Sequence, residues 1–430
     1  MAPMEPWQRV WIDAKTYSQD VHSMIACTEC HGGTAVDDFE LAHEGMVDRP
    51  ASNPETCGSC HTNLKEPVMN SLHTTLRGYD TVLHARSVPE NHPALEEMQA
   101  NHCISCHTTC GDCHISQPQN VGGGLLRAHT YVRTPPMSQT CTACHGSRVK
   151  DEYFGLNEGV PPDVHFLARM SCSDCHTSAE IHGVGIDPNH RYDGPQQPNC
   201  LDCHADPAGI GSGIEEHEIH GTEILSCQAC HSTTYTNCVN CHVEKSPEGI
   251  PFFTVEDHFT GFVLGRNPRR SAERPYRFVP LRHVPIDVNS FSFYGENLLP
   301  NFDALPTWAY ATPHNIQRIA PQARTCESCH ANDDLFLTPD KVAPETLNAN
   351  ASVIVESAPP LPRGYVPAAP EEPSAPTGGG EDDFWGGSSG SSGSGDAGSS
   401  AEDDFWGDGS SATPQAPSSE EEDDEDFWGS

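Results

Sequence analysis

One five-residue pattern, Cys-x-x-Cys-His, occurs ten times between residues 27 and 330 and constrains the fold more than any other feature of the chain. The copies begin at Cys27, Cys57, Cys103, Cys110, Cys141, Cys172, Cys200, Cys227, Cys238 and Cys326. They use all twenty cysteines, so none remains for a disulfide, a thiol catalyst or an iron–sulfur cluster. The pattern is the attachment signature of c-type haem, in which two thiols reach the vinyl groups of one porphyrin and the histidine reaches its iron.

The motifs predict ten covalently bound c-type haems. The thioether-forming cysteines are the pairs Cys27 and Cys30, Cys57 and Cys60, Cys103 and Cys106, Cys110 and Cys113, Cys141 and Cys144, Cys172 and Cys175, Cys200 and Cys203, Cys227 and Cys230, Cys238 and Cys241, and Cys326 and Cys329. The proximal iron ligands are His31, His61, His107, His114, His145, His176, His204, His231, His242 and His330. Zinc ribbons also use Cys-x-x-Cys, but zinc does not require a histidine after every second cysteine. A disulfide framework would not place cysteines in identical pairs three residues apart.

Fifteen histidines outside the motifs offer a second axial ligand for each iron, whereas the chain has only eight methionines. The predicted distal ligands are His22, His43, His73, His102, His129, His165, His182, His220, His283 and His314. Two imidazoles fill both axial positions and give low-spin iron, which suits electron transfer. All ten motifs end in histidine, and none is a Cys-x-x-Cys-Lys variant. These features favour an electron carrier, and no catalytic residue is predicted.

The density of motifs limits the kind of core that the chain can build. The first 330 residues carry one motif per 33 residues, and only 36% of the chain is hydrophobic. We therefore expect the porphyrins to form the core, with the polypeptide wrapped around them. The predicted fold is mostly irregular, with short α-helices and little β-structure. The 37 prolines and 36 glycines agree with many turns.

The composition changes near residue 348, which divides the chain into a predicted decahaem core (1–347) and a disordered tail (348–430) rich in proline, glycine, serine and acidic residues. Three acidic repeats end in Phe-Trp-Gly, at residues 381–386, 402–407 and 424–429. Large aromatic residues inside an acidic disordered tail indicate linear docking motifs, and three copies would give avidity. A solubilising acidic tail is the alternative, and the docking partner is not indicated.

The formal net charge of −38 is spread over both parts, with −18 on residues 1–330 and −20 on residues 331–430. Such a charge disfavours nucleic acid and is compatible with basic proteins, metal cations or mineral surfaces. No stretch approaches the roughly 18 apolar residues of a transmembrane helix, and Met1 to Arg9 does not resemble a signal peptide. Because haem is attached outside the cytoplasmic membrane, we expect an exported protein whose export signal is missing from this sequence. The expected location is extracellular or at the cell surface, otherwise periplasmic.

Three stretches add a family resemblance to the motifs. They are residues 141–148 (CTACHGSR), residues 281–285 (LRHVP) and the run from Tyr310 to Arg318 (YATPHNIQR). With the motifs, they make roughly residues 20–340 similar to the exported multihaem c-type cytochromes of bacteria and archaea. The resemblance implies electron transfer with redox partner proteins or extracellular acceptors. Some members polymerise into cytochrome filaments, which makes a filament subunit one form of the prediction. The alternative is a multihaem reductase of a small nitrogen or sulfur compound, which would need one open-site haem.

Overall fold

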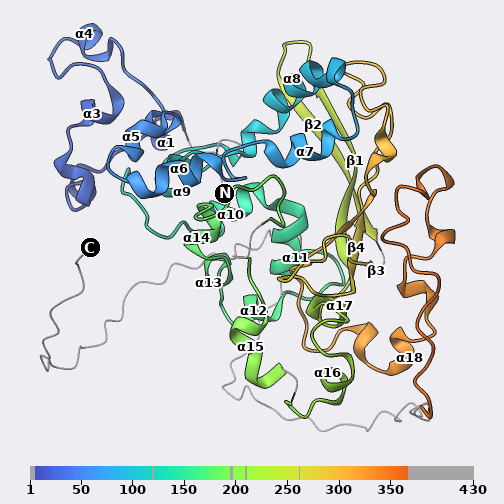
Figure 1. The fold of residues 1–430 in the computed structure, drawn as a ribbon. Coiled ribbons are helices and arrows are strands. Elements are labelled where there is room, and N and C mark those ends of the chain that lie inside the picture. Colours follow the sequence, from blue (N-terminus) through green and yellow to red (C-terminus); the bar gives the residue numbers. More distant parts are fainter. Residues whose placement is uncertain (1–4, 119–120, 194–196, 209–210, 261, 367–430) are drawn as a thin grey trace, which may run out of the picture. The chain divides into compact units, whose positions relative to one another are not determined.

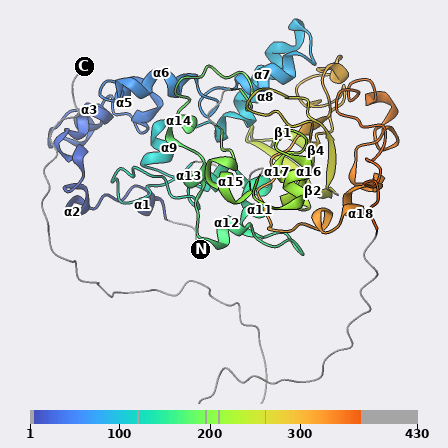
Figure 2. The ribbon, with the colours of Figure 1, turned by 60° about the horizontal axis from the view of Figure 1, so that its bottom comes forward.

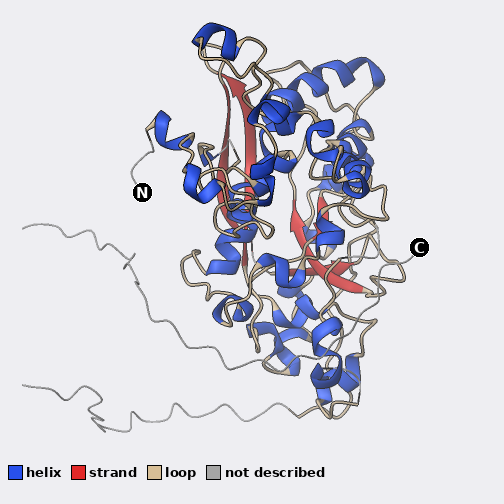
Figure 3. Ribbon diagram, turned by 90° about the vertical axis from the view of Figure 1, so that its left-hand side faces the viewer, coloured by secondary structure: helices blue, strands red, loops and turns tan. Residues whose placement is uncertain are grey.

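The computed structural model describes residues 5–118, 121–193, 197–208, 211–260 and 262–366, all within one compact unit (Met1–Pro367) (Figure 1). The three Phe-Trp-Gly repeats lie outside the described residues. Short helices joined by turns dominate, and strands are few (Figure 3). The fold class is therefore the one that the motif density predicts. Within the described ranges, no helix is both long enough and apolar enough to cross a membrane.

The α-helices are short, and the longest has eleven residues. In chain order they are α1 (Pro6–Arg9), α2 (Ala14–Tyr17), α3 (Cys27–His31), α4 (Phe39–His43), α5 (Pro54–Gly58), α6 (Thr62–Asn70), α7 (Arg77–His84), α8 (His92–His102), α9 (Cys110–His114), α10 (Cys141–Cys144), α11 (Asp151–Phe154), α12 (Val164–Leu167), α13 (Cys172–Cys175), α14 (Ser178–Ile181), α15 (Leu201–Ala208), α16 (Glu215–His220), α17 (Cys227–His231) and α18 (Cys326–Cys329).

Six of these helices begin at the first cysteine of a motif: α3, α9, α10, α13, α17 and α18. The residue before that cysteine is a helix cap in several of them. Thr109 and Asp112 form a capping box at α9, and Ser171 and Asp174 form another at α13. One helical turn places positions i, i+3 and i+4 on the same side. The local sequence thus turns both cysteines and the following histidine towards one face.

The strands form two small sheets. β1 (Tyr235–Lys245) and β2 (Pro251–Thr260) make an antiparallel hairpin, with an irregularity in register between Val239 and His242. This hairpin contains the ninth motif. β3 (Val263–Arg266), β4 (Phe278–His283) and β5 (Trp308–Tyr310) form an antiparallel sheet in the order β3-β4-β5.

The apolar core is unevenly distributed along the chain. Leu264, Leu281 and Leu337 are almost fully buried around the three-stranded sheet, and Leu95 and Leu299 are buried between α8 and the segment before β5. Among the described residues 7–82, by contrast, only the small residues Gly58 and Ser71 are buried. The polypeptide around the first two motifs therefore has no hydrophobic core of its own.

The compact unit extends past residue 347, the boundary that composition predicts. Val353 and Asn350 have no exposed surface. The Asn350 side-chain oxygen accepts hydrogen bonds from the main-chain N–H groups of Thr307 and Trp308, both at 3.0 Å. These contacts tie residues 348–355 to the edge of the sheet, although their proline- and alanine-containing surroundings resemble a linker.

Candidate haem-binding sites

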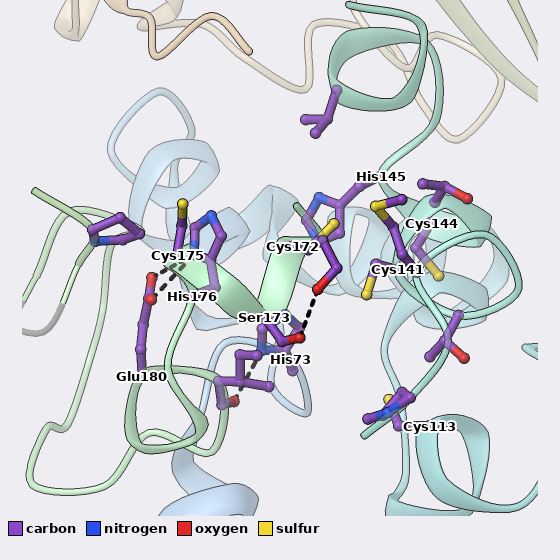
Figure 4. A pocket seen from close by; sticks show the side chains of 18 of the residues that line it. His73, Cys113, Cys141, Cys144, His145, Cys172, Ser173, Cys175, His176 and Glu180 are labelled. Atoms are coloured by element: carbon purple, nitrogen blue, oxygen red, sulfur yellow. Dashed lines mark hydrogen bonds and ion pairs between the residues drawn. The ribbon is translucent and has the colours of Figure 1, made fainter. Parts of the chain in front are cut away.

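A single continuous cavity of about 4360 Å³ is lined by both cysteines and the histidine of eight motifs, and by Cys106 of the third. A pocket for one small ligand measures roughly 300–1,000 Å³. The cavity is thus several times larger than one ligand needs. Figure 4 shows part of its wall, where the cysteines of α10 and α13 lie near His145 and His176.

Eight pairs of imidazoles line this cavity, each joining a motif histidine to a histidine outside the motifs. Their ring centres are 5.9–6.4 Å apart. The pairs are His31–His129, His61–His22, His114–His182, His145–His73, His176–His314, His204–His165, His231–His217 and His330–His220. Two imidazoles on opposite sides of one metal ion, each with a nitrogen at roughly 2 Å as in zinc sites, have ring centres about 6 Å apart. The spacing therefore fits bis-histidine ligation.

The hydrogen bonds of the imidazoles orient them for metal binding. In nine of the sixteen, Nδ1 donates to a carbonyl or carboxylate oxygen at 2.7–3.2 Å, which leaves the Nε2 lone pair available. The acceptor is a main-chain carbonyl for six of them: His31, His73, His114, His220, His231 and His330. It is a carboxylate for His22, His165 and His176.

Two of the carboxylates belong to the same local device, Asp-Val-His. Asp20 caps a 3₁₀ helix (Val21–Met24) and accepts from both the main-chain N–H and Nδ1 of His22, at 2.9 Å each. Asp163 caps α12 and accepts the same two bonds from His165, at 2.7 and 2.8 Å. Burial alone would raise the pKa of Asp20, but hydrogen bonds from His22 and Tyr131 lower it below its usual value.

Burial keeps several paired imidazoles in the neutral form that binds metals. Desolvation, followed by the influence of neighbouring imidazoles, lowers the pKa of His145 and of His314 to about 4. Desolvation by the surrounding protein also lowers the pKa of His73, His129 and His182. A neutral imidazole offers its nitrogen lone pair at physiological pH without first losing a proton.

Contacts between thiols of different motifs give the spatial order of the motifs; these sulfur atoms stand for the thioethers of the haem-loaded protein. The first cysteines of neighbouring motifs are hydrogen-bonded in three places: Cys57 with Cys110, Cys141 with Cys172, and Cys200 with Cys227. Four further pairs lie near enough for one thiol to raise the pKa of the other: Cys30 with Cys57, Cys113 with Cys141, Cys175 with Cys203, and Cys230 with Cys329. Eight motifs therefore form a row in the order first, second, fourth, fifth, sixth, seventh, eighth and tenth.

The third and ninth motifs lie beside the fifth. The main-chain N–H of Thr108, next to His107, donates to the carbonyl of His73 at 2.8 Å, and His73 is paired with His145. The ring of His107 has Tyr79 at 6.0 Å between centres. Strand β1, which carries the ninth motif, contacts the π-helical turn Gly146–Lys150 that follows His145. The side chains of Cys238, Cys241 and His242 lie outside the described residues.

Three predicted distal ligands have neighbours other than a motif histidine. His43 donates from Nδ1 to the carbonyl of Phe39 at 2.7 Å on α4. His102 shares a hydrogen bond of 2.6 Å between Nε2 and the hydroxyl of Tyr294. His283 packs on the ring of Trp308 at 4.9 Å. Among the residues that the structure describes, His43 forms no imidazole pair of the kind described above.

Five histidines outside the motifs were not among the predicted ligands, and three of them lie in informative places. His217 lies on α16 three residues before His220, and the two face the eighth and tenth motif histidines. Their i, i+3 spacing is the sequence signal for two ligands on one helix face. His84 and His92 stack at 3.8 Å, and the Nε2 atom of each is buried without a hydrogen-bond partner.

Short Cys-x-x-Cys-His helices and paired imidazoles around a continuous cavity, with little apolar core, define a multihaem c-type cytochrome. Residues 19–191, which carry six of the ten motifs, match the family of outer membrane cytochromes described as MtrC/MtrF-like, domains II/IV. The octahaem cytochrome c from Shewanella oneidensis aligns with a TM-score of 0.32 and 14% sequence identity over 54% of this chain and 71% of that chain. No curated protein matches the sequence.

Proposed function

We propose that this protein conducts electrons through ten bis-histidine c-type haems in extracellular electron transfer. The observation that carries the proposal is the row of eight imidazole pairs along one continuous cavity. Bound haem supplies reversible one-electron exchange at iron. The chain attaches each porphyrin through two cysteines, presents two Nε2 atoms to its iron, and fixes the imidazoles through their Nδ1 hydrogen bonds.

The row defines the electron path. It begins at α3 with the first motif and ends at α18 with the tenth (Figures 1 and 2). In three places, neighbouring motifs along it are in contact through their first cysteines, as Cys141 is with Cys172. The third motif adjoins the row at the fifth, and strand β1 with the ninth motif contacts the turn after His145, so both offer electrons further ways into or out of the protein. Filled axial positions along the row leave iron no site for a substrate, which favours conduction.

The reductase alternative rests on the third motif. His107 faces Tyr79 at 6.0 Å, so an iron there differs in surroundings from the eight in the row. Cys103 packs against an apolar cluster that contains Leu83 of α7 and Leu95 of α8. The same two helices carry His84 and His92, respectively. We propose that one of these two histidines binds the third iron, because the Nε2 atoms of both are buried and make no hydrogen bond. A third iron without such a ligand would be the open site that a reductase needs.

Replacing His314 with alanine tests the axial pairs directly. His314 pairs with His176 at 6.4 Å, so its loss is expected to convert one low-spin ferric haem into a high-spin one. Low-temperature EPR of the oxidised protein measures this, with haem content determined as the pyridine haemochrome. The matched control is His190→Ala, since His190 lines the same cavity and also has its pKa lowered to about 4, but its ring packs against Tyr192 at a tilt. An unchanged spectrum for His314→Ala would contradict the ligation. A high-spin signal in the unaltered protein would favour the reductase.

Self-assembly, export and docking by the tail extend the proposal. Self-assembly is supported by large apolar side chains that are exposed near the N-terminus, including Trp7 at 60%, Trp11 at 62% and Met24 at 93% exposure. Filaments visible by electron microscopy of the haem-loaded protein are the expected result, and a monomer at high concentration by sedimentation would contradict it. We propose that the Phe-Trp-Gly repeats recruit a separate partner. The proposed location is outside the cytoplasm, at the cell surface or in the medium.

A further inference from the structure

In three of the sixteen paired imidazoles, Nδ1 donates a hydrogen bond to a carboxylate. These three imidazoles belong to the pairs of three different motifs. Asp20 accepts this bond from His22 in the pair of the second motif, Glu180 accepts it from His176 in the sixth, and Asp163 accepts it from His165 in the seventh. We propose that these carboxylates make the second, sixth and seventh haem sites the lowest in reduction potential. The inference rests on the proposed function, because it concerns how the row distributes electrons.

The three carboxylates are well placed to act on the imidazoles. Their side chains are only 7% exposed for Asp20, 3% for Asp163 and 18% for Glu180. Both oxygens of Glu180 lie 3.1 Å from Nδ1 of His176 (Figure 4). A charge that is shielded from water acts more strongly on its neighbour than an exposed one.

A carboxylate acceptor draws the Nδ1 proton towards itself and makes Nε2 a stronger electron donor. A stronger donor and a nearby negative charge both stabilise ferric iron more than ferrous iron, which lowers the potential. The other motif pairs of the row have no such acceptor among the contacts described for them. His31, His114, His231 and His330 donate instead to main-chain carbonyls, which carry no net charge.

The sixth and seventh motifs are consecutive in the row, so their carboxylates create one low-potential segment inside it. Asp163 also connects the two sites. Its second oxygen accepts from the main-chain N–H of Ile316 at 2.7 Å, two residues beyond His314 of the sixth pair. When electrons are added step by step, the sites on either side of the segment are expected to be reduced first. The haems of the segment and of the second site are expected to be reduced last.

The variant Glu180→Gln tests the proposal at one site, because glutamine keeps an acceptor oxygen and removes the charge. We expect the ratio of ferrous to ferric haem at that site to rise about tenfold at a fixed potential, in line with other losses of ligand-supporting contacts. For a one-electron couple this is a positive shift of about 59 mV. A spectroelectrochemical titration of the haem-loaded protein measures it as a displacement of one haem-equivalent of the Soret and α-band absorbance.

The matched control is Glu216→Gln. Glu216 lies four residues before His220, as Glu180 lies four after His176, but it accepts the Nδ1 hydrogen bond through its main-chain carbonyl. The control loses the same charge and keeps that bond. Its haem reduction potentials are therefore expected to match those of the unaltered protein. Asp163→Asn tests the proposal at a second site, where the reduction potential of another haem is expected to shift to a more positive value.

The inference would be overturned if Glu180→Gln, Asp163→Asn and the unaltered protein had the same set of haem reduction potentials. Equal shifts for Glu180→Gln and Glu216→Gln would also overturn it, because net charge would then explain the effect without the hydrogen bond. Failure of the proposed function is recognised separately. In that case the unaltered protein would contain fewer haems than motifs or a high-spin iron by EPR, whatever the potentials of the variants.

Discussion

Without attached haem, residues 7–82 are expected to exchange their amide hydrogens as fast as an unfolded chain. This segment buries no large side chain among its described residues, and Leu83 is the first core residue along the sequence. Backbone ordering costs roughly 1–2 kcal/mol per residue, which has to be offset by burial. In this segment, only contacts with porphyrin are available to offset it. The local free energy of opening is therefore expected to fall to about zero.

Hydrogen exchange measured by mass spectrometry compares this segment with a second region of the same protein. The protein is produced once with haem attachment and once in cells that cannot attach haem. The internal control is residues 262–355, where Leu264, Leu281 and Val353 form an apolar core around the sheet. In the haem-free protein, peptides from this region are expected to exchange more slowly than those from 7–82. Equal protection of both regions would show that the N-terminal part folds on its own.

Replacing Cys141 and Cys144 together with serine is expected to interrupt the electron path at its centre. The fifth motif lies between the fourth and the sixth in the row, with Cys113 on one side and Cys172 on the other. It also adjoins the third motif through the hydrogen bond from Thr108 to His73. The variant is expected to carry nine haems in place of ten and to lose most of the current between electrodes bridged by the protein. Conductance of films with equal protein content measures this loss.

The matched control removes a haem from the end of the row. Serine at Cys326 and Cys329 also leaves nine haems, but the row from the first to the eighth motif stays continuous. This control is expected to conduct nearly as well as the unaltered protein, because only the terminal step is lost. If the two variants conducted equally, the motif order inferred from the thiol contacts would be wrong.

Local sequence explains why the motifs form the helices observed. Ser171 and Asp174, or Thr109 and Asp112, supply the caps that start a single turn at a cysteine, so these elements depend on neighbours within five residues. The Asp-Val-His device is equally local, and it orients His22 and His165 through bonds that span two residues. Features of this kind were open to prediction from the sequence.

The distal histidines illustrate the limit of such reasoning. His43 and His217 each lie on a short helix next to acidic residues, yet only His217 is brought to a motif histidine. His314 reaches His176 because Glu152 and Asp163 accept the main-chain N–H groups of His314 and Ile316, at 2.8 and 2.7 Å. These partners are far apart in the sequence, and no local pattern links them.

The sequence alone predicts ten haem-attachment motifs, the cysteines proposed to form the thioethers, and the face on which a single helical turn presents them. Those properties follow from covalent chemistry and from single helical turns, both of which are set within five residues. Only the tertiary structure decided which imidazole lies opposite each of eight motif histidines and in which order these eight motifs follow one another in space. The pairs His330–His220 and His176–His314 bring together segments distant in the sequence. Their positions depend on the packing of the whole chain around the cavity, which no local pattern encodes.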